Sequence, residues 1–350
     1  MPELPEVEAG RRLVETHVLG SKITGVTIVE QGGGPLNGAV DSIVLQSPDL
    51  LEAMLLQSKI VSANRRGKQL FFILDKGDAS LLLHFGMSGA LVVEGEDPVQ
   101  YINTKVQSSF PPKYTKFMLT FENGKRLAYA DPRRLGRIKL VIGNPLTQPP
   151  LSKLAPDPLQ DGLDPRVFAE RIAKYTLPIK ALLLDQEAVL SGIGNYLADE
   201  VLYQSGIHPK TSAAGIPAHK AIELAEVIVH VVSTACNLTA ANVDFPKDWL
   251  FHYRWAKGKG GGAKMPDGSG ITFDTVGGRT TAIVESKQKR TFLSGESATA
   301  SAKPKPKPKA KGTKRKAAEE QDDEGGEAGR EEETKVAKPA SKRSKAAAKR

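Results

Sequence analysis

The sequence contains a single cysteine and no long apolar run. One cysteine, Cys236, excludes an internal disulfide and a cysteine-based zinc site, because a structural zinc ion needs four Cys or His ligands. A membrane-spanning helix needs about 20 apolar residues. The longest candidate, Leu224 to Val232, is interrupted by Glu226 and His230. We therefore expect a soluble protein that binds no metal and no cofactor.

The N-terminus lacks the basic residues of a targeting peptide. Residues 1–8 read MPELPEVE, whereas signal and transit peptides begin basic or rich in Arg and Ser. We expect no cleavage there except removal of Met1.

Positive charge is concentrated at the C-terminus. The 350 residues carry a formal charge of +9, and residues 301–350 hold 16 of the 49 Lys and Arg residues but only 9 of the 40 Asp and Glu residues. Large apolar side chains are rare from residue 293 onward, so we expect a disordered tail. Its basic clusters, Lys314–Lys316 and Lys342–Lys345, are typical of nuclear import or of nonspecific DNA binding. We predict a nuclear monomer.

Changes in residue pattern predict an α+β chain. Alternating apolar residues and turn signals predict short strands from residue 22 to about 142, after a first helix that Pro5 opens and Gly20 closes. Apolar residues spaced three or four apart predict helices after residue 164. The expected parts are a β-sandwich (2–143), a linker (144–164), a helical domain (165–244), a hairpin segment (245–292) and the tail (293–350).

Pro2 is a candidate nucleophile. Removal of Met1 would expose a secondary amine, and α-amino groups have pKa values near 8, so part of the population is uncharged at neutral pH. Such an amine attacks a carbonyl-like carbon and forms a cationic iminium, which favours elimination at the neighbouring carbon. Glu3 could move the proton. Taken alone, Pro2 also fits an ordinary helix entry.

Several short motifs could bind nucleic acid. Arg65-Arg66-Gly67-Lys68 precedes an apolar strand, Asp131–Gly136 places two arginines and Leu135 on a turn, and Ser191–Tyr196 is a glycine-rich connection before a helix. Cations and free helix N–H groups bind phosphate, and inserted apolar side chains separate base pairs. Each motif alone also fits a structural turn.

Read in order, these motifs resemble the formamidopyrimidine-DNA glycosylase family. The resemblance includes PELPEVE (2–8), RRGK (65–68), HFGMSG (84–89), DPRR (131–134), GIGNYLADE (192–200) and GIHP (206–209), and it extends from Pro2 to about Phe292. It implies a β-sandwich that carries the catalytic N-terminus, a helix-two-turn-helix domain and a finger hairpin.

The resemblance also implies the reaction and the residues that carry it out. A damaged nucleotide is flipped out of double-stranded DNA, Pro2 attacks its sugar, Glu3 supplies a proton, and β,δ-elimination cuts the strand. The implied phosphate-binding residues are Lys68, which is also counted as catalytic, together with Lys180, Asn195 and Arg279. The residues implied to fill the emptied stack are Met87, Arg133 and Leu135, and the implied acidic neighbours of the active site are Glu6 and Glu200.

Three departures from the family pattern bear on the substrate. Leu135 stands where phenylalanine is usual, the four-cysteine finger is replaced by Gly278-Arg279-Thr280-Thr281, as in zincless plant and fungal members, and Val243–Trp249 is short for a lesion-capping loop. The sequence therefore favours ring-opened purines, further-oxidised guanine products and abasic sites over intact 8-oxoguanine.

Two alternative functions stay open. One is an enzyme for oxidised pyrimidines that resembles endonuclease VIII, and the other is a non-catalytic protein that binds DNA damage. The opening Leu4-Pro5-Glu6-Val7 favours the purine-directed branch.

Overall fold

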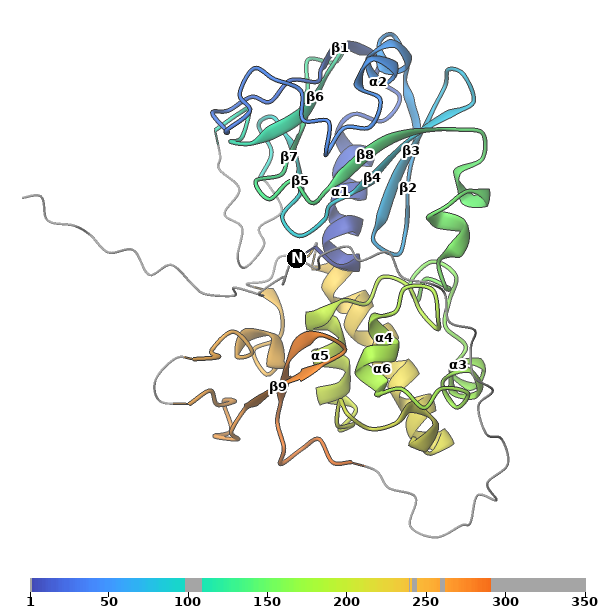
Figure 1. Cartoon of the computed structure of the whole chain (residues 1–350), viewed down its shortest axis with the longest axis vertical. Helices are drawn as coiled ribbons and strands as arrows, with labels where there is room; N and C mark the ends of the chain where they lie inside the picture. The colour runs from blue at the N-terminus through green and yellow to red at the C-terminus, as the bar shows by residue number, and fades with distance from the viewer. Residues whose placement is uncertain (1, 98–108, 239, 241–243, 259–261, 291–350) are drawn as a thin grey trace, which may run out of the picture. The chain divides into compact units, whose positions relative to one another are not determined.

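Two antiparallel sheets form the framework of the first 142 residues (Figure 1). The computed structural model describes residues 2–97, 109–238, 240, 244–258 and 262–290. One sheet has the order β1-β6-β7-β5 and the other β2-β3-β4-β8. The strands are β1 (Ile23–Thr27), β2 (Ile60–Arg66), β3 (Gln69–Leu74), β4 (Ala79–His84), β5 (Ala90–Val93), β6 (Thr115–Phe121), β7 (Arg126–Ala130) and β8 (Arg137–Ile142).

The two sheets share one apolar core. Phe72 and Leu83 from one sheet and Leu119 and Tyr129 from the other are buried in the same cluster. The residues of β3, β4 and β6 that enter this cluster alternate along each strand, as a two-residue side-chain period requires, although most of their neighbours are also buried. The predicted sandwich is therefore confirmed.

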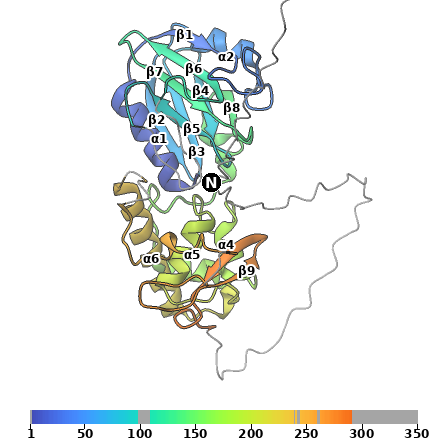
Figure 2. The same cartoon turned by 90° about the vertical axis from the view of Figure 1, so that its left-hand side faces the viewer.

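Helix α1 (Leu4–His17) packs against β2 and β3, as Figure 2 shows. Pro5 lies in its first turn, where a missing N–H costs nothing, and Gly20 follows its end with a φ of 74°. Val7 joins the sandwich core, whereas Leu4 joins the core of the helical part. The first turn of α1 thus belongs to both halves of the molecule.

One helix of the first half was not predicted. Residues 22–142 were expected to contain strands alone, but α2 (Pro48–Leu55) lies between β1 and β2. Pro48 starts it, and Leu51 and Leu55, four residues apart, are buried. The helical spacing covers only two turns, too short to stand out among strands.

Helices make up most of the second half, as predicted. They are η1 (Pro145–Thr147), η2 (Leu151–Lys153), α3 (Pro165–Ile172), α4 (Ile179–Leu184), α5 (Asn195–Gln204), η3 (Ala213–Gly215), α6 (Ala218–Asn237) and η5 (Leu250–His252), followed by the hairpin of β9 (Thr272–Val276) and β10 (Arg279–Ile283). None of the described helices is long and apolar enough to cross a membrane.

Contacts group Met1–Glu296 into one compact unit. The domain boundaries expected within that range therefore stay predictions. The predicted tail lies outside the described residues.

A buried arginine joins the sandwich to the segment that precedes α3. Arg65, at the end of β2, pairs with Asp157 and donates through Nε to Glu8 of α1 at 3.2 Å. The carboxylate of Asp157 also accepts the N–H of Gly67 at 2.8 Å. A buried charge is stable only when it is paired, so these contacts depend on one another.

We predict that Asp157→Asn lowers the free energy of unfolding by about 3 kcal/mol, because Arg65 loses a buried counter-charge. Urea denaturation would measure the change. Glu94→Gln is the matched control: Glu94 pairs with Arg126, and its side chain is 37% exposed. Its loss should cost less than about 1 kcal/mol. Equal losses for the two variants would contradict the proposed importance of burial.

Candidate functional site

The carboxylate of Glu3 caps the N-terminus of α5. It accepts the backbone N–H groups of Gly194, Tyr196 and Leu197 at 2.8, 2.9 and 3.2 Å. The first N–H groups of a helix have no partner within the helix, and the helix dipole is positive at this end. Glu3, 191 positions before Gly194, thus binds the free N–H groups at the start of α5. These bonds also fix the position of the neighbouring residue Pro2.

Two glycines allow this close approach. A Cβ at Gly194 would lie 2.2 Å from Cδ of Glu3, and one at Gly192, where φ is 93°, would lie 2.5 Å from Leu4. The N–H of Leu4 also donates to the carbonyl of Gly192 at 3.2 Å. Backbone groups of the glycine-rich connection therefore bind Glu3 and Leu4, whereas the motif alone suggests that its N–H groups bind phosphate.

Glu6 forms a second buried acidic group beside Glu3. It accepts the N–H of Glu3 at 2.8 Å and the hydroxyl of Tyr196 at 2.9 Å. Burial, and then the nearby Glu3, raise the pKa of Glu6 to about 7. Burial also raises the pKa of Glu3, against the charge of Lys68 and the N–H groups of Tyr196 and Leu197. Proton exchange at these carboxyls is therefore shifted toward neutral pH.

Three predicted phosphate-binding residues converge on these carboxyls. Lys68 lies at the turn between β2 and β3, and burial lowers its pKa, with Glu3 opposing that effect and Arg279 adding to it. Nδ2 of Asn195 donates to the carbonyl of Thr280, next to Arg279, at 3.0 Å. The Oδ1 atom of Asn195 is buried without a hydrogen-bond partner. The sandwich, α5 and the hairpin each contribute one of these side chains.

Lys180, for which DNA binding was predicted, lies inside the protein in contact with Asp199 and Thr281. It is fully buried, and its Nζ lies 2.7 Å from Oδ1 of Asp199 and 2.7 Å from Oγ1 of Thr281. Asp199 also accepts from Arg254 at 2.8 Å and from the N–H of Ala282 at 3.1 Å. The sequence did not indicate this cluster of contacts around Asp199. The cluster holds the hairpin against α5 without any cysteine ligand.

For the two arginines of the basic motif, the sequence left phosphate binding and an ordinary turn both open. Arg65 is buried against Glu8 and Asp157, and Arg66 pairs with Asp161. Of this motif, only Lys68 reaches the carboxyl cluster. Residue type alone does not show whether an arginine pairs with an acidic side chain inside the protein or lies free in solvent. The motif therefore overstated the number of free cations.

The three residues predicted to fill the DNA stack lie on two adjacent loops. Met87 is half-buried, whereas Arg133 and Leu135 are exposed, Leu135 by 41%. A Cβ at Gly86, where φ is 62°, would lie 2.4 Å from the carbonyl carbon of Leu135, so the two loops are in direct contact. The second arginine of the turn, Arg134, pairs with Asp41 and does not project with Arg133.

Glu200 lies on α5, buried beneath an aromatic cluster. It accepts the N–H of Phe251 at 2.8 Å and Nε2 of Gln204 at 2.9 Å. Burial raises its pKa to about 7. Phe251 in turn packs edge-on against Tyr196, with ring centroids 5.0 Å apart. Through Phe251, Glu200 thus supports the ring of Tyr196, whose hydroxyl donates to Glu6.

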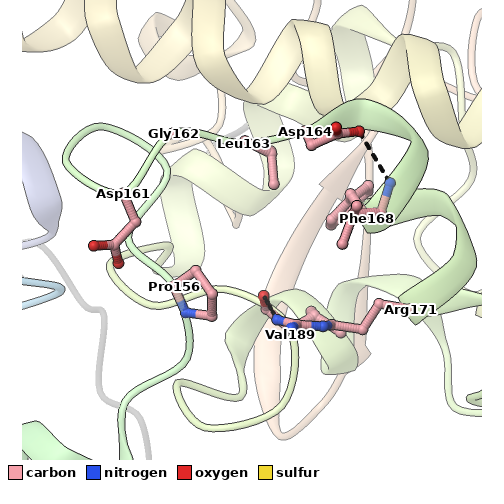
Figure 3. A pocket seen from close by; sticks show the side chains of 9 residues that line it. Pro156, Asp161, Gly162, Leu163, Asp164, Phe168, Arg171 and Val189 are labelled. Carbon is pink, nitrogen blue, oxygen red and sulfur yellow. Dashed lines mark hydrogen bonds between the residues drawn. The ribbon is translucent and has the colours of Figure 1, made fainter.

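A separate pocket lies beside α3 and is shown in Figure 3. It encloses about 490 Å³, and its lining residues are Pro156, Asp161, Gly162, Leu163, Asp164, Val167, Phe168, Arg171 and Val189. No predicted site residue lines it. In the described part of the chain, no three His, Cys, Asp or Glu side chains are grouped as a metal site.

Comparison with known proteins places both halves of the chain in one family. The formamidopyrimidine-DNA glycosylase N-terminal domain matches residues 1–138, and the H2TH domain of the same glycosylase matches residues 154–246. The formamidopyrimidine-DNA glycosylase of Arabidopsis thaliana is 40% identical over 291 residues, which cover 83% of this chain and 71% of the relative. The enzyme of Chloroflexus aurantiacus is 34% identical over 236 residues, covering 67% and 76%.

Solved structures agree with this assignment. The Lactococcus lactis formamidopyrimidine-DNA glycosylase, bound non-covalently to DNA with an abasic site, matches with a TM-score of 0.63 and 26% identity over 83% of this chain and 100% of that chain. The Thermus thermophilus MutM protein matches with a TM-score of 0.62 and 27% identity over 83% and 99%. The same fold therefore extends across most of this chain.

We predict that Glu200→Gln weakens the pH dependence of stability. A carboxyl with a folded pKa of about 7 and an unfolded value of 4.5 holds a proton in the folded state alone between these values. The free energy of unfolding should therefore fall as the pH rises through this window, by about 3 kcal/mol for this group. Urea titrations at pH 5 and pH 8 would measure it.

Glutamine mimics the protonated carboxyl, so Glu200→Gln should match the wild type at pH 5 and exceed it at pH 8. Glu223→Gln, at a side chain that is 44% exposed, is the control and should keep the wild-type slope. An unchanged slope in Glu200→Gln would show that this carboxyl does not carry the proton.

Proposed function

Because the chain belongs to the formamidopyrimidine-DNA glycosylase family, we propose that Pro2 is the nucleophile of its reaction. The protein is a bifunctional DNA glycosylase of base excision repair with lyase activity at abasic sites, and damaged double-stranded DNA is its partner. The observation that supports Pro2 best is the fixed position of the next residue, Glu3. The Glu3 carboxylate accepts N–H groups at the N-terminus of α5, and Glu6 and the charge of Lys68 lie near it.

In the proposed mechanism, the nitrogen of Pro2 bonds to C1′ of a flipped-out nucleotide. The glycosidic bond breaks, the base leaves with the electron pair, and Glu3 donates a proton to the sugar ring oxygen as the ring opens. The amine proton of Pro2 passes to the departing base, which leaves an iminium. The iminium acidifies the neighbouring sugar carbon, so loss of a C2′ proton to solvent expels the 3′ phosphate, and loss of a C4′ proton to solvent then expels the 5′ phosphate. The raised pKa of Glu3 supports this role, because it keeps a proton available nearer to neutral pH.

We assign phosphate binding around the flipped nucleotide to Lys68, Asn195 and Arg279. Their convergence supports this assignment, and so does the Nδ2 amide group of Asn195, which donates to the carbonyl of Thr280 beside Arg279. Met87, Arg133 and Leu135 would fill the emptied stack, with Arg133 facing the orphaned base. Leu135 offers an apolar wedge without aromatic stacking. Ring-opened purines, further-oxidised guanine and abasic sites are the proposed substrates.

We expect borohydride to trap a covalent complex between the protein with a native N-terminus and a duplex that contains an abasic site. Mass mapping should locate the adduct on Pro2, because reduction converts the iminium into a stable amine. Pro2→Gly keeps an N-terminal amine but not the secondary amine, so its trapping rate should fall by about tenfold or more. An N-terminal extension should abolish trapping.

Tight binding to the same duplex without any adduct would favour the alternative of a non-catalytic damage binder. Parallel cleavage of duplexes with a ring-opened guanine or thymine glycol would test the alternative preference for oxidised pyrimidines. A faster reaction on thymine glycol would contradict the purine preference.

We further propose that the basic tail binds DNA nonspecifically and directs the protein to the nucleus. The basic clusters Lys314–Lys316 and Lys342–Lys345 support this proposal. Deletion of residues 297–350 should flatten the dependence of log K on log salt, because fewer cations displace counterions from DNA. The same deletion should remove nuclear accumulation of a C-terminal fluorescent fusion. An unchanged salt slope would refute the DNA-binding role, and unchanged accumulation would refute the import role.

A further inference from the structure

The wedge loop, residues 131–136, is closed on itself by Asp131. The carboxylate of Asp131 accepts the hydroxyl of Ser88 at 2.7 Å and the N–H groups of Gly136 and Arg133 at 2.7 and 3.2 Å. On its far side, Arg137 donates to the carbonyl of Gly136 at 2.6 Å. The loop backbone is therefore held at both ends, while the side chains of Arg133 and Leu135 remain exposed.

Arg134, between these two exposed residues, turns the opposite way. Its φ is 57°, a left-handed backbone conformation that a residue other than glycine keeps only when neighbouring contacts stabilise it. Its Nε and Nη2 atoms donate to the two carboxylate oxygens of Asp41 at 2.8 and 3.0 Å. This bidentate pair defines the direction of the guanidinium as well as its distance from Asp41.

Asp41 belongs to a buried group of charges. Glu30, Asp41 and Lys116 are all fully buried, and Lys116 contacts Glu30 and lies 3.2 Å from Asp41. With Arg134, these residues make two anions and two cations, and the buried Asp131 of the wedge loop adds a third anion whose charge acts on Lys116. Removing Arg134 would therefore leave buried negative charge uncompensated.

The backbone around Asp41 is anchored beside β8, the strand that follows the wedge loop. The N–H of Ile138 donates to the carbonyl of Val44 at 2.8 Å, and the N–H of Gln46 donates to the carbonyl of Ile138 at 2.9 Å. The Oδ1 atom of Asp41 also accepts the N–H of Ile43 at 3.2 Å. The segment of Asp41 and the wedge loop are thus both attached to the edge strand β8, so their positions relative to each other are fixed.

We propose that Asp41 is a positioning residue for DNA recognition, because through Arg134 it sets the direction in which Arg133 and Leu135 leave the wedge loop. Side chains held in their bound direction before DNA arrives lose less conformational entropy on insertion. This inference rests on the proposed function, in which Arg133 and Leu135 fill the emptied stack. It assigns a role to a residue about 90 positions earlier in the chain than the loop.

The test compares two DNA substrates in borohydride trapping. Arg134→Met should lower the trapping rate on an abasic duplex by about tenfold, because misplaced groups lose the benefit of orientation. On a single-stranded oligonucleotide with the same abasic site, no stack has to be filled, so its rate should stay within about twofold of the wild-type rate. Arg134→Lys keeps a cation near Asp41 and should restore part of the duplex rate.

Arg126→Met is the matched control, because Arg126 pairs with Glu94 on the same domain and both Arg126 and Arg134 are 35% exposed. It should leave both rates unchanged. Asp41→Asn should reproduce the duplex loss, and the double variant with Arg134→Met should lose no more than either single variant.

Equal losses on both substrates would mean general damage to the fold and would overturn the inference, as would an unchanged duplex rate in Arg134→Met. Failure of the wild-type protein to form an adduct on either substrate would count against the nucleophile Pro2 instead. The two proposals can therefore fail separately.

Discussion

The hydrogen bonds between Glu3 and the N-terminus of α5 are the constraint on which the site depends. Three N–H groups that α5 cannot satisfy internally are satisfied by a residue of the N-terminal segment. Because Glu3 also precedes the first turn of α1, one side chain fixes the positions of two helix starts. Gly192 and Gly194 make the approach possible, since a Cβ at either position would overlap Leu4 or Glu3.

This arrangement also produces the chemical properties of the site. Burial raises the pKa of both Glu3 and Glu6, and the nearby Glu3 raises the pKa of Glu6 further. Lys68 supplies compensating positive charge to Glu3 from the turn between β2 and β3. The contacts that join the parts of the molecule thus also prepare an acid beside the N-terminal amine.

The same logic extends to the surface that meets DNA. Buried charges hold the backbone behind two of its residues: Asp199 and Lys180 lie behind the hairpin of Arg279, and the buried Asp41 pairs with Arg134, next to Arg133. Rigid support of this kind reduces the entropy lost on binding. Charged residues that look equivalent in the sequence therefore divide into those that support the surface and those that form it.

The sequence by itself determined that a strand-rich part precedes a helical part, although it missed the short helix α2, because the spacing of apolar residues and the turn signals are local properties of the chain. It also predicted that Pro2, Glu3, Lys68, Asn195 and Arg279 belong to one site, through ordered motifs that resemble a family. Only the tertiary structure decided that Lys180 is buried against Asp199 and that Arg134 pairs with Asp41. Such pairings join residues far apart in the chain, and burial in three dimensions has no local signal in the sequence.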